Sequence, residues 1–201
     1  MTETDRKTSF SERVSSRPIR PWHVALVLAV ICAAGLWEYA SGRPPICPCG
    51  RIALWAGEVH GPENSQMIAD WYSLSHVVHG FLFYAALWLV ARRLPVGVRL
   101  VIATMIEAFW EVLENSPLII DRYRAVTLAF GYSGDSILNS MSDIGFMIVG
   151  FLVAALIPVW TSVVVVIALE LIALVAIRDN LTLNVLMLLY PLDAVRDWQD
   201  R

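Results

Sequence analysis

The sequence predicts an all-α protein, a polytopic membrane helix bundle with about five transmembrane helices, with four or six left open. Of its 201 residues, 57% are hydrophobic and 16% are charged, whereas a soluble domain has about 45–50% apolar and about 25% charged residues. The mean hydropathy is +0.60. Several apolar runs reach the length of about 20 residues that crosses a membrane. This composition excludes an ordinary soluble domain and a disordered chain, and the net charge of −3 argues against a nucleic-acid binder.

The spans follow one another along the chain. We expect them at residues 21–40, 71–91, 97–115, about 136–157 and about 159–177. The third is the least apolar, because its uncharged stretch stops at Glu107, and Pro158 separates the last two.

The remaining segments complete a single membrane domain at 21–201. A polar tail precedes it at 1–20, and an outer loop with Cys47 and Cys49 occupies about 41–70. These cysteines could form a tight disulfide, bind a metal or stay as thiols. The apolar run after the fifth span is too short to cross and is broken by Pro191, so we expect about 181–201 to be interfacial or re-entrant.

Basic residues near the span ends indicate the orientation, because cytoplasmic loops are enriched in them. Five precede the first span and three follow the second: Arg6, Lys7, Arg13, Arg17, Arg20, Arg92, Arg93 and Arg99. The loops on the other side carry two each: Arg43, Arg51, Arg122 and Arg124. The sequence therefore predicts a multi-pass protein of the bacterial cell inner membrane with a cytoplasmic N-terminus. Membrane lipid is the expected partner, and protein partners and oligomeric state stay open.

Ionisable residues at membrane depth are costly, which makes them candidates for function. They form helical stripes in three spans, and each stripe starts at the outer end. Their members are His76 and His79 in the second span, Glu107, Glu111 and Glu114 in the third, and Asp135, Asn139 and Asp143 in the fourth. The topology and the stripes together predict a polar site that opens to the periplasmic side.

Carboxylates outnumber the bases in this predicted site, so it needs a cation, shared protons or a cationic ligand. A divalent metal ion is the cofactor that we consider, with ligands from His76, His79, Glu107, Glu111 and Asp143. His76, Glu111 and Asp135 are the catalytic candidates. The candidates for binding a ligand are Arg122, Arg124 and Asn139. The two arginines would bind an anionic headgroup through bidentate contacts. A polar site without metal, and side chains that only pair with one another to join helices, remain alternatives.

Two functions from different classes follow. The first is a hydrolase or transferase, metal-dependent in its sharpest form, that acts on a lipid or envelope precursor headgroup. The second is a non-catalytic binding or assembly factor whose buried polar residues are structural. An ion or proton pathway ranks last, because Glu170 is the one acid left for the inner half of the membrane.

Several runs of the sequence are specific enough to resemble a known family. These are GRPPICPCG, DWYSLSHVVHGFLFY, EAFWEVLEN, RYRAVTLAFGYSGDSILNSMSD and IRDNLTLNVLMLLYP. They are similar to an uncharacterised family of bacterial multi-pass inner-membrane proteins, a domain of unknown function, from about residue 42 to 198. This resemblance implies the architecture and no activity.

A looser resemblance is to VanZ-like membrane proteins. Asp70 and His76 would match an acid and a His that open one helix, and Glu111 or Glu107 a Glu of a later helix. In addition, Arg124, Asp135 and Asn139 would match an Arg followed by an Asp and an Asn. Trp71 stands where those proteins have a Lys. The resemblance implies a similar architecture and a link to glycopeptide tolerance and cell-envelope chemistry.

Overall fold

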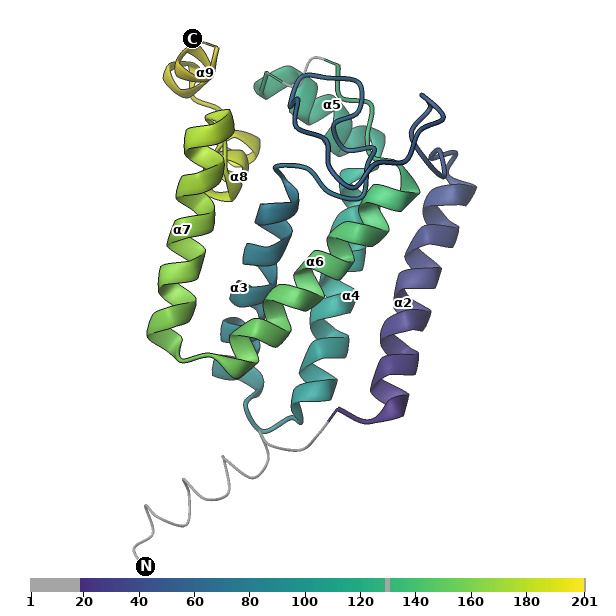
Figure 1. Cartoon of the computed structure of the whole chain (residues 1–201), viewed down its shortest axis with the longest axis vertical. Helices are drawn as coiled ribbons and strands as arrows, with labels where there is room; N and C mark the ends of the chain where they lie inside the picture. The colour runs from purple at the N-terminus through teal and green to yellow at the C-terminus, as the bar shows by residue number, and fades with distance from the viewer. Residues whose placement is uncertain (1–18, 129–130, 201) are drawn as a thin grey trace, which may run out of the picture.

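The computed structural model describes residues 19–128 and 131–200, and within these ranges the chain has helices and loops but no strand (Figure 1). This confirms the all-α prediction. All but the last two residues of the predicted polar tail lie outside the described residues. The helices are α2 (Pro21–Ala40), α3 (Ser73–Ala91), α4 (Val96–Glu114), α5 (Pro117–Val126), α6 (Ile137–Leu156), α7 (Val159–Ile177), α8 (Leu181–Leu189) and α9 (Asp193–Gln199).

Five of these helices, α2, α3, α4, α6 and α7, have 19 or 20 residues and match the five predicted spans to within two residues at each end. By length and composition, four of the described helices are apolar enough to cross a membrane, namely α2, α3, α6 and α7. The exception, α4, packs against α2, α3 and α6. Its charged residues Arg99, Glu107 and Glu111 are buried. The bundle therefore encloses the charges that make α4 less apolar.

The helices share two ends. The starts of α2, α4 and α7 and the end of α3 lie at one end, which we call the N-terminal end (Figure 1). The loop of residues 41–72 and helix α5 cover the opposite end, which we call the loop end. In the view of Figure 1, α6 crosses in front of α3 and α4.

Two glycines allow α3 and α6 to touch along their backbones. A Cβ atom on Gly80 would meet the carbonyl oxygen of Met147, and one on Gly150 would meet the carbonyl oxygen of Val77. Small residues at such a crossing are typical of helices that associate in membranes. Between this crossing and the N-terminal end, Leu87 of α3 and Phe151 of α6 belong to the apolar core.

The last part of the chain folds back beside α7. The carboxylate of Glu170, two turns before the end of α7, accepts hydrogen bonds from the backbone N–H groups of Leu181 (3.1 Å) and Thr182 (3.0 Å) at the start of α8. Because the first N–H groups of a helix lack partners within it, Glu170 stabilises this start. Glu170 thus lies in the half of α7 nearer the loop end, and it does not extend the acidic cluster toward the N-terminal end.

The loop of residues 41–72 is fastened to the start of α6. The N–H groups of Ile137 and Leu138 donate to the carbonyls of Pro44 (2.9 Å) and Pro45 (3.1 Å). Cys47 and Cys49 form a disulfide, which answers the open question of their state. Cys47 packs in a small core of this loop with Met67. We therefore treat residues 41–72 as an ordered cap on the bundle.

Candidate functional site

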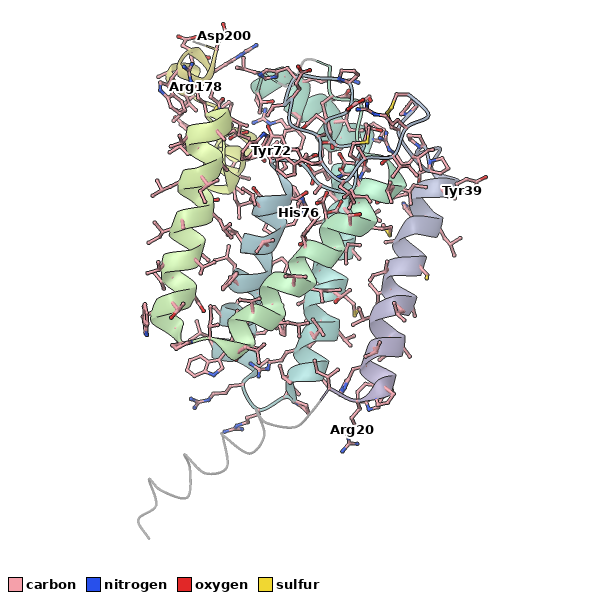
Figure 2. The ribbon with its side chains drawn as sticks, in the orientation of Figure 1. Arg20, Tyr39, Tyr72, His76, Arg178 and Asp200 are labelled. Carbon is pink, nitrogen blue, oxygen red and sulfur yellow. A yellow bond between two sulfur atoms is a disulfide. The ribbon has the colours of Figure 1, made fainter. Side chains whose placement is uncertain are left out.

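Polar side chains gather in the half of the bundle next to the loop end. Figure 2 shows Tyr72 and His76 there, among many oxygen atoms, with Arg20 at the opposite end. His76, Glu107, Glu111 and Asp143 are all buried. The predicted stripes of α3, α4 and α6 therefore meet inside one part of the protein.

The two histidines of α3 share a carboxylate from α4. The Nδ1 atom of His76 lies 2.7 Å from Oε1 of Glu107, and the Nδ1 atom of His79 lies 3.0 Å from the same oxygen. His76 and His79 stand one turn apart on α3, so both can reach a single residue of the neighbouring helix. One ligand atom from each of these three residues lies within 4.8 Å of the other two.

Two further carboxylates complete this cluster around His76. Oε1 of Glu111, one turn along α4 from Glu107, lies 3.3 Å from the Nδ1 atom of His76. On the other side of the ring, Oδ2 of Asp143 lies 3.8 Å from Nε2, and its Oδ1 accepts a hydrogen bond from the Ser73 hydroxyl (3.0 Å). The structure therefore brings together the five residues that the sequence suggested as metal ligands, and we call them the His–Glu cluster.

Glu111 differs from the other members of the His–Glu cluster. It is 1% exposed, and neither of its carboxylate oxygens has a hydrogen-bond partner among the described residues. Burying a carboxyl group without such a partner is costly. Among the members of the His–Glu cluster, Glu111 is therefore the one whose negative charge most needs compensation by a proton or a cation.

Asp135 lies before α6 and not on its first turn, because Ser136 caps the helix and accepts a hydrogen bond from the N–H of Asn139. Its carboxylate accepts hydrogen bonds from Asn115 Nδ2 (3.1 Å) and from the Tyr132 hydroxyl (3.0 Å). Burial raises the pKa of Asp135 to about 6. The predicted stripe therefore does not act as one unit. Asp143 belongs to the His–Glu cluster, whereas the bonds of Asp135 lead to residues outside it.

Asn139 and Asp70 hold the loop of residues 41–72. The Nδ2 atom of Asn139 donates to the carbonyl of Met67 (2.9 Å). Asp70 accepts from the N–H groups of Ser65 (2.9 Å) and Tyr72 (2.8 Å), and burial raises its pKa. These two polar side chains act as connectors of the fold. This arrangement fits the alternative in which the buried polar side chains only hold the fold together.

The two arginines suggested for headgroup binding lie on α5, and neither lines the cavity described below. The guanidinium group of Arg122 donates twice to the carbonyl of Leu188 in α8 (3.0 and 2.9 Å). That of Arg124 donates to the carbonyl of Tyr132 (2.5 Å) and lies 3.8 Å from Asp121. The structure therefore does not bring Arg122 or Arg124 to the His–Glu cluster, and α5, which we expected as a loop, is a helix that begins with Pro117.

Residues outside the suggested catalytic, ligand-binding and metal-binding sets connect α7 and α8 to the site. The Tyr72 hydroxyl donates to Oδ2 of Asp179 (3.3 Å), and the Tyr123 hydroxyl donates to Oδ1 of Asn184 (2.8 Å). Burial raises the pKa of Asp179 to about 6. A polar pair directly after an apolar span, Asp179 and Asn180, is the signal that the sequence offers for this junction. The two tyrosines carry no such signal.

A cavity of about 1260 Å³ adjoins the His–Glu cluster. His76, His79, Glu107 and Asp143 lie on its wall, together with apolar residues of α3, α4, α7 and α8. Arg43 of the loop also lines it and donates to the carbonyls of Ser133 (2.6 Å) and Asp135. The cavity therefore combines a polar part, which holds the cluster, with an apolar part.

The fold and the site define an all-helical protein whose helices are apolar enough for a membrane and enclose a His–carboxylate cluster. Residues 36–201 match the family described as "Protein of unknown function (DUF2585)", and the chain belongs to this family. This confirms the resemblance to an uncharacterised family, whereas the VanZ-like resemblance stays a prediction.

Relatives with the name "UPF0314 protein" match most of the chain. That of Paracoccus denitrificans is 59% identical over 170 residues, which cover 85% of this chain and 88% of the relative. That of Sphingopyxis alaskensis is 56% identical over 179 residues, 89% of this chain and 94% of the relative. That of Rhizobium etli is 54% identical over 178 residues, 89% and 91% of the two chains. No solved structure matches.

Proposed function

We propose that this protein is a multi-pass protein of the bacterial inner membrane, with a cytoplasmic N-terminus, whose His–Glu cluster binds a divalent metal ion. The proposed activity is hydrolysis or group transfer at the headgroup of a lipid or envelope precursor. The observation that carries this proposal is the meeting of His76, His79 and Glu107, whose ligand atoms lie within 4.8 Å of one another beside a large cavity.

The donor set supports a metal ion over simple pairing of side chains. Imidazole nitrogens and carboxylate oxygens from facing helices are the ligands by which helix bundles hold transition metals. Glu107 already has two histidine neighbours, whereas the buried Glu111 has no hydrogen-bond partner among the described residues. A divalent cation next to His76 would compensate the charge of both carboxylates.

The roles of the side chains follow from these positions. His76, His79 and Glu107 would hold the ion, which would activate water and polarise the phosphoryl or acyl oxygen. Glu111, as general base, takes a proton from the attacking water. The water oxygen then bonds to phosphorus or to the acyl carbon, the ester bond to the leaving alcohol breaks, and that alcohol receives the proton.

The position of the site supports a substrate from the membrane. The cluster lies on α3 and α4 within a few turns of the loop end, where the headgroups of one leaflet would lie. The cap of residues 41–72 covers that end, and its Arg43 is on the cavity wall. A headgroup would therefore meet the cluster without leaving the membrane interface.

Metal content tests the proposal directly. The protein is purified without chelators and analysed by elemental mass spectrometry, before and after loading with Zn²⁺, Mn²⁺ or Fe²⁺. We expect stoichiometric metal in the wild type, and its loss in His79→Ala and Glu107→Gln. Glu58→Gln, which replaces an exposed loop carboxylate that does not line the cavity, is the matched control for Glu107→Gln and should keep the metal. A wild type that stays empty after loading would refute the metal-dependent activity.

A second candidate function is a non-catalytic assembly factor whose polar residues hold the fold. The bonds of Asp70, Asp135 and Asn139 to the loop and its neighbours favour this alternative for that part of the site. It predicts that Glu111→Gln lowers abundance and melting temperature together. The metal proposal predicts that Glu111→Gln keeps both and loses the activity or cellular phenotype.

A further inference from the structure

The cavity beside the His–Glu cluster is lined from the loop end toward the middle of the bundle, and we call it the slot. Tyr72, His76, His79 and Phe83 line it along one face of α3. Tyr72 and Phe83 are eleven positions apart, so this wall is about 16 Å long at a rise of 1.5 Å per residue. That length is about half the thickness of the hydrocarbon layer.

The chemistry of the slot changes along its length. Tyr72 and His76 line the part at the loop end, and His79 follows one turn deeper. The ring of His79 stacks on that of Phe83, with the ring centres 5.6 Å apart. Ile106 and Trp110 of α4 also line the slot; Ile106 is the neighbour of Glu107, and Trp110 lies one turn nearer the loop end. The deepest residues of the wall on α3 and α4, Phe83 and Ile106, are therefore apolar, whereas the polar lining residues of these helices lie nearer the loop end.

The apolar part opens sideways. Glu107 has no exposed surface, but the neighbouring Ile106 is 43% exposed and Phe109, also on the slot wall, is 67% exposed. The wall thus continues from the buried cluster to the surface that faces lipid. On the opposite side, Leu181 and Val185 of α8 line the slot.

Helix α7 leaves room for this opening. Ala173 is its one buried residue, so α7 packs loosely on the bundle. The hydrogen bonds of Asp179 to Tyr72 and of Asn184 to Tyr123 hold the α7–α8 pair at the loop end. The volume of about 1260 Å³ also exceeds the range of about 300–1,000 Å³ that is usual for pockets of small molecules.

We propose that the slot takes up an acyl chain of a lipid from the leaflet at the loop end, through the opening between α4 and α8. A lipid of that leaflet has its headgroup at the membrane surface and the end of its chain at the midplane, which is the polarity profile of the slot. Its headgroup then lies at the His–Glu cluster. This inference names the substrate class for the proposed function and rests on it for the chemistry.

Photo-cross-linking in vesicles of phosphatidylethanolamine and phosphatidylglycerol tests this inference. The probe is a phosphatidylethanolamine with a diazirine near the end of one acyl chain, and the labelled residues are mapped by mass spectrometry. We expect severalfold more label on Phe83 and Ile106 than on Met105, which is 55% exposed on the same helix α4 but outside the slot. Equal labelling of Ile106 and Met105 would mean contact with bulk lipid alone and would overturn the proposal.

A variant pair separates the slot from the surrounding lipid. Ile106→Trp narrows the opening and should reduce the label on Phe83 severalfold, whereas Met105→Trp adds the same ring outside the slot and should leave it unchanged. A Phe83 label that is equal in the two variants contradicts the sideways opening. The Tm of both variants is measured, so that unfolding is recognised.

The two proposals fail in different ways. If Phe83 is labelled in a wild type that takes up no metal, the lipid slot stands and the metal-dependent chemistry falls. If the protein binds metal and Phe83 is labelled no more than Met105, the reverse holds. Labelling of Phe83 in Glu107→Gln at the wild-type level would show that the chain occupies the slot independently of the cluster, as we expect.

Discussion

Replacing Gly80 by alanine would force the backbones of α3 and α6 apart. The added Cβ atom would meet the carbonyl oxygen of Met147 and the backbone nitrogen of Phe151. Both contacts are to backbone, so no flexible side chain can move away. Overpacking of this kind costs about 1–3 kcal/mol. Alanine in place of glycine in a helix returns about 0.5–1 kcal/mol, so we expect a net loss of up to about 2.5 kcal/mol.

Gly145→Ala provides the matched control for this prediction. Gly145 also lies in α6, and a Cβ atom there would have no atom within 4 Å. This variant should gain about 0.5–1 kcal/mol from helix propensity alone. The free energy of unfolding of both variants is measured by thermal or denaturant unfolding in detergent, followed by tryptophan fluorescence.

Gly80→Ala also tests how the crossing of α3 and α6 supports the His–Glu cluster. His76 lies one turn before Gly80 on α3, and its partner Asp143 lies on α6. Separating the helices should therefore weaken the proposed metal binding in Gly80→Ala and leave it unchanged in Gly145→Ala. If Gly80→Ala is as stable as Gly145→Ala, the contact of the two backbones does not determine how α3 and α6 pack, and this reasoning is wrong.

Three further predictions concern α7, α8 and the orientation. Glu170→Ala removes the acceptor of two N–H groups at the start of α8, so protease should cleave this region faster, with a stability loss of about 1–3 kcal/mol. Burial raises the pKa of Asp179 from 3.8 to about 6, so the folded protein binds this proton more tightly than the unfolded chain. The contribution of this proton to the free energy of unfolding is complete below about pH 4 and is lost as the pH rises through 6. The total loss is on the order of 3 kcal/mol. Asp179→Asn should flatten the dependence of Tm on pH between 4 and 8, and an unchanged slope would contradict this. In a background without the exposed cysteine of α2, a membrane-impermeant maleimide added to intact cells should label Arg51→Cys and spare Arg93→Cys, whereas the opposite pattern would invert the orientation.

The helices were predictable because two simple rules act on them. A span needs about twenty apolar residues, and the ends of α2 and α7 fall where the sequence placed them. The helical period also placed Glu107 and Glu111 on one face of α4, toward His76. A pattern within one helix was thus enough to find members of the His–Glu cluster, although it could not show which helices face one another.

Contacts between distant segments account for what was missed. The helical period predicts Asp135 on the stripe of α6, but the helix begins after its cap Ser136, and Tyr132 and Asn115 hold the Asp135 carboxylate instead. The charge of Arg122 is typical of a residue that binds anions, but its guanidinium group donates to the carbonyl of Leu188, 66 positions away. Helix α5 begins with Pro117, a usual first residue of a helix, but its composition is that of a loop. Hydrogen-bond partners that are distant in the sequence become neighbours only in the folded chain, so a pattern within one segment does not reveal them.

The fastening of the loop of residues 41–72 to α6 has a consequence for biosynthesis. The carbonyls of Pro44 and Pro45 emerge from the ribosome long before Ile137 and Leu138, the residues that donate to them. Arg43 must likewise wait for Asp135, 92 positions later. The Cys47–Cys49 disulfide joins residues that are 2 positions apart and needs no such delay. Closure of the cap is therefore a late step, and a nascent chain that ends before α6 leaves this end of the bundle open.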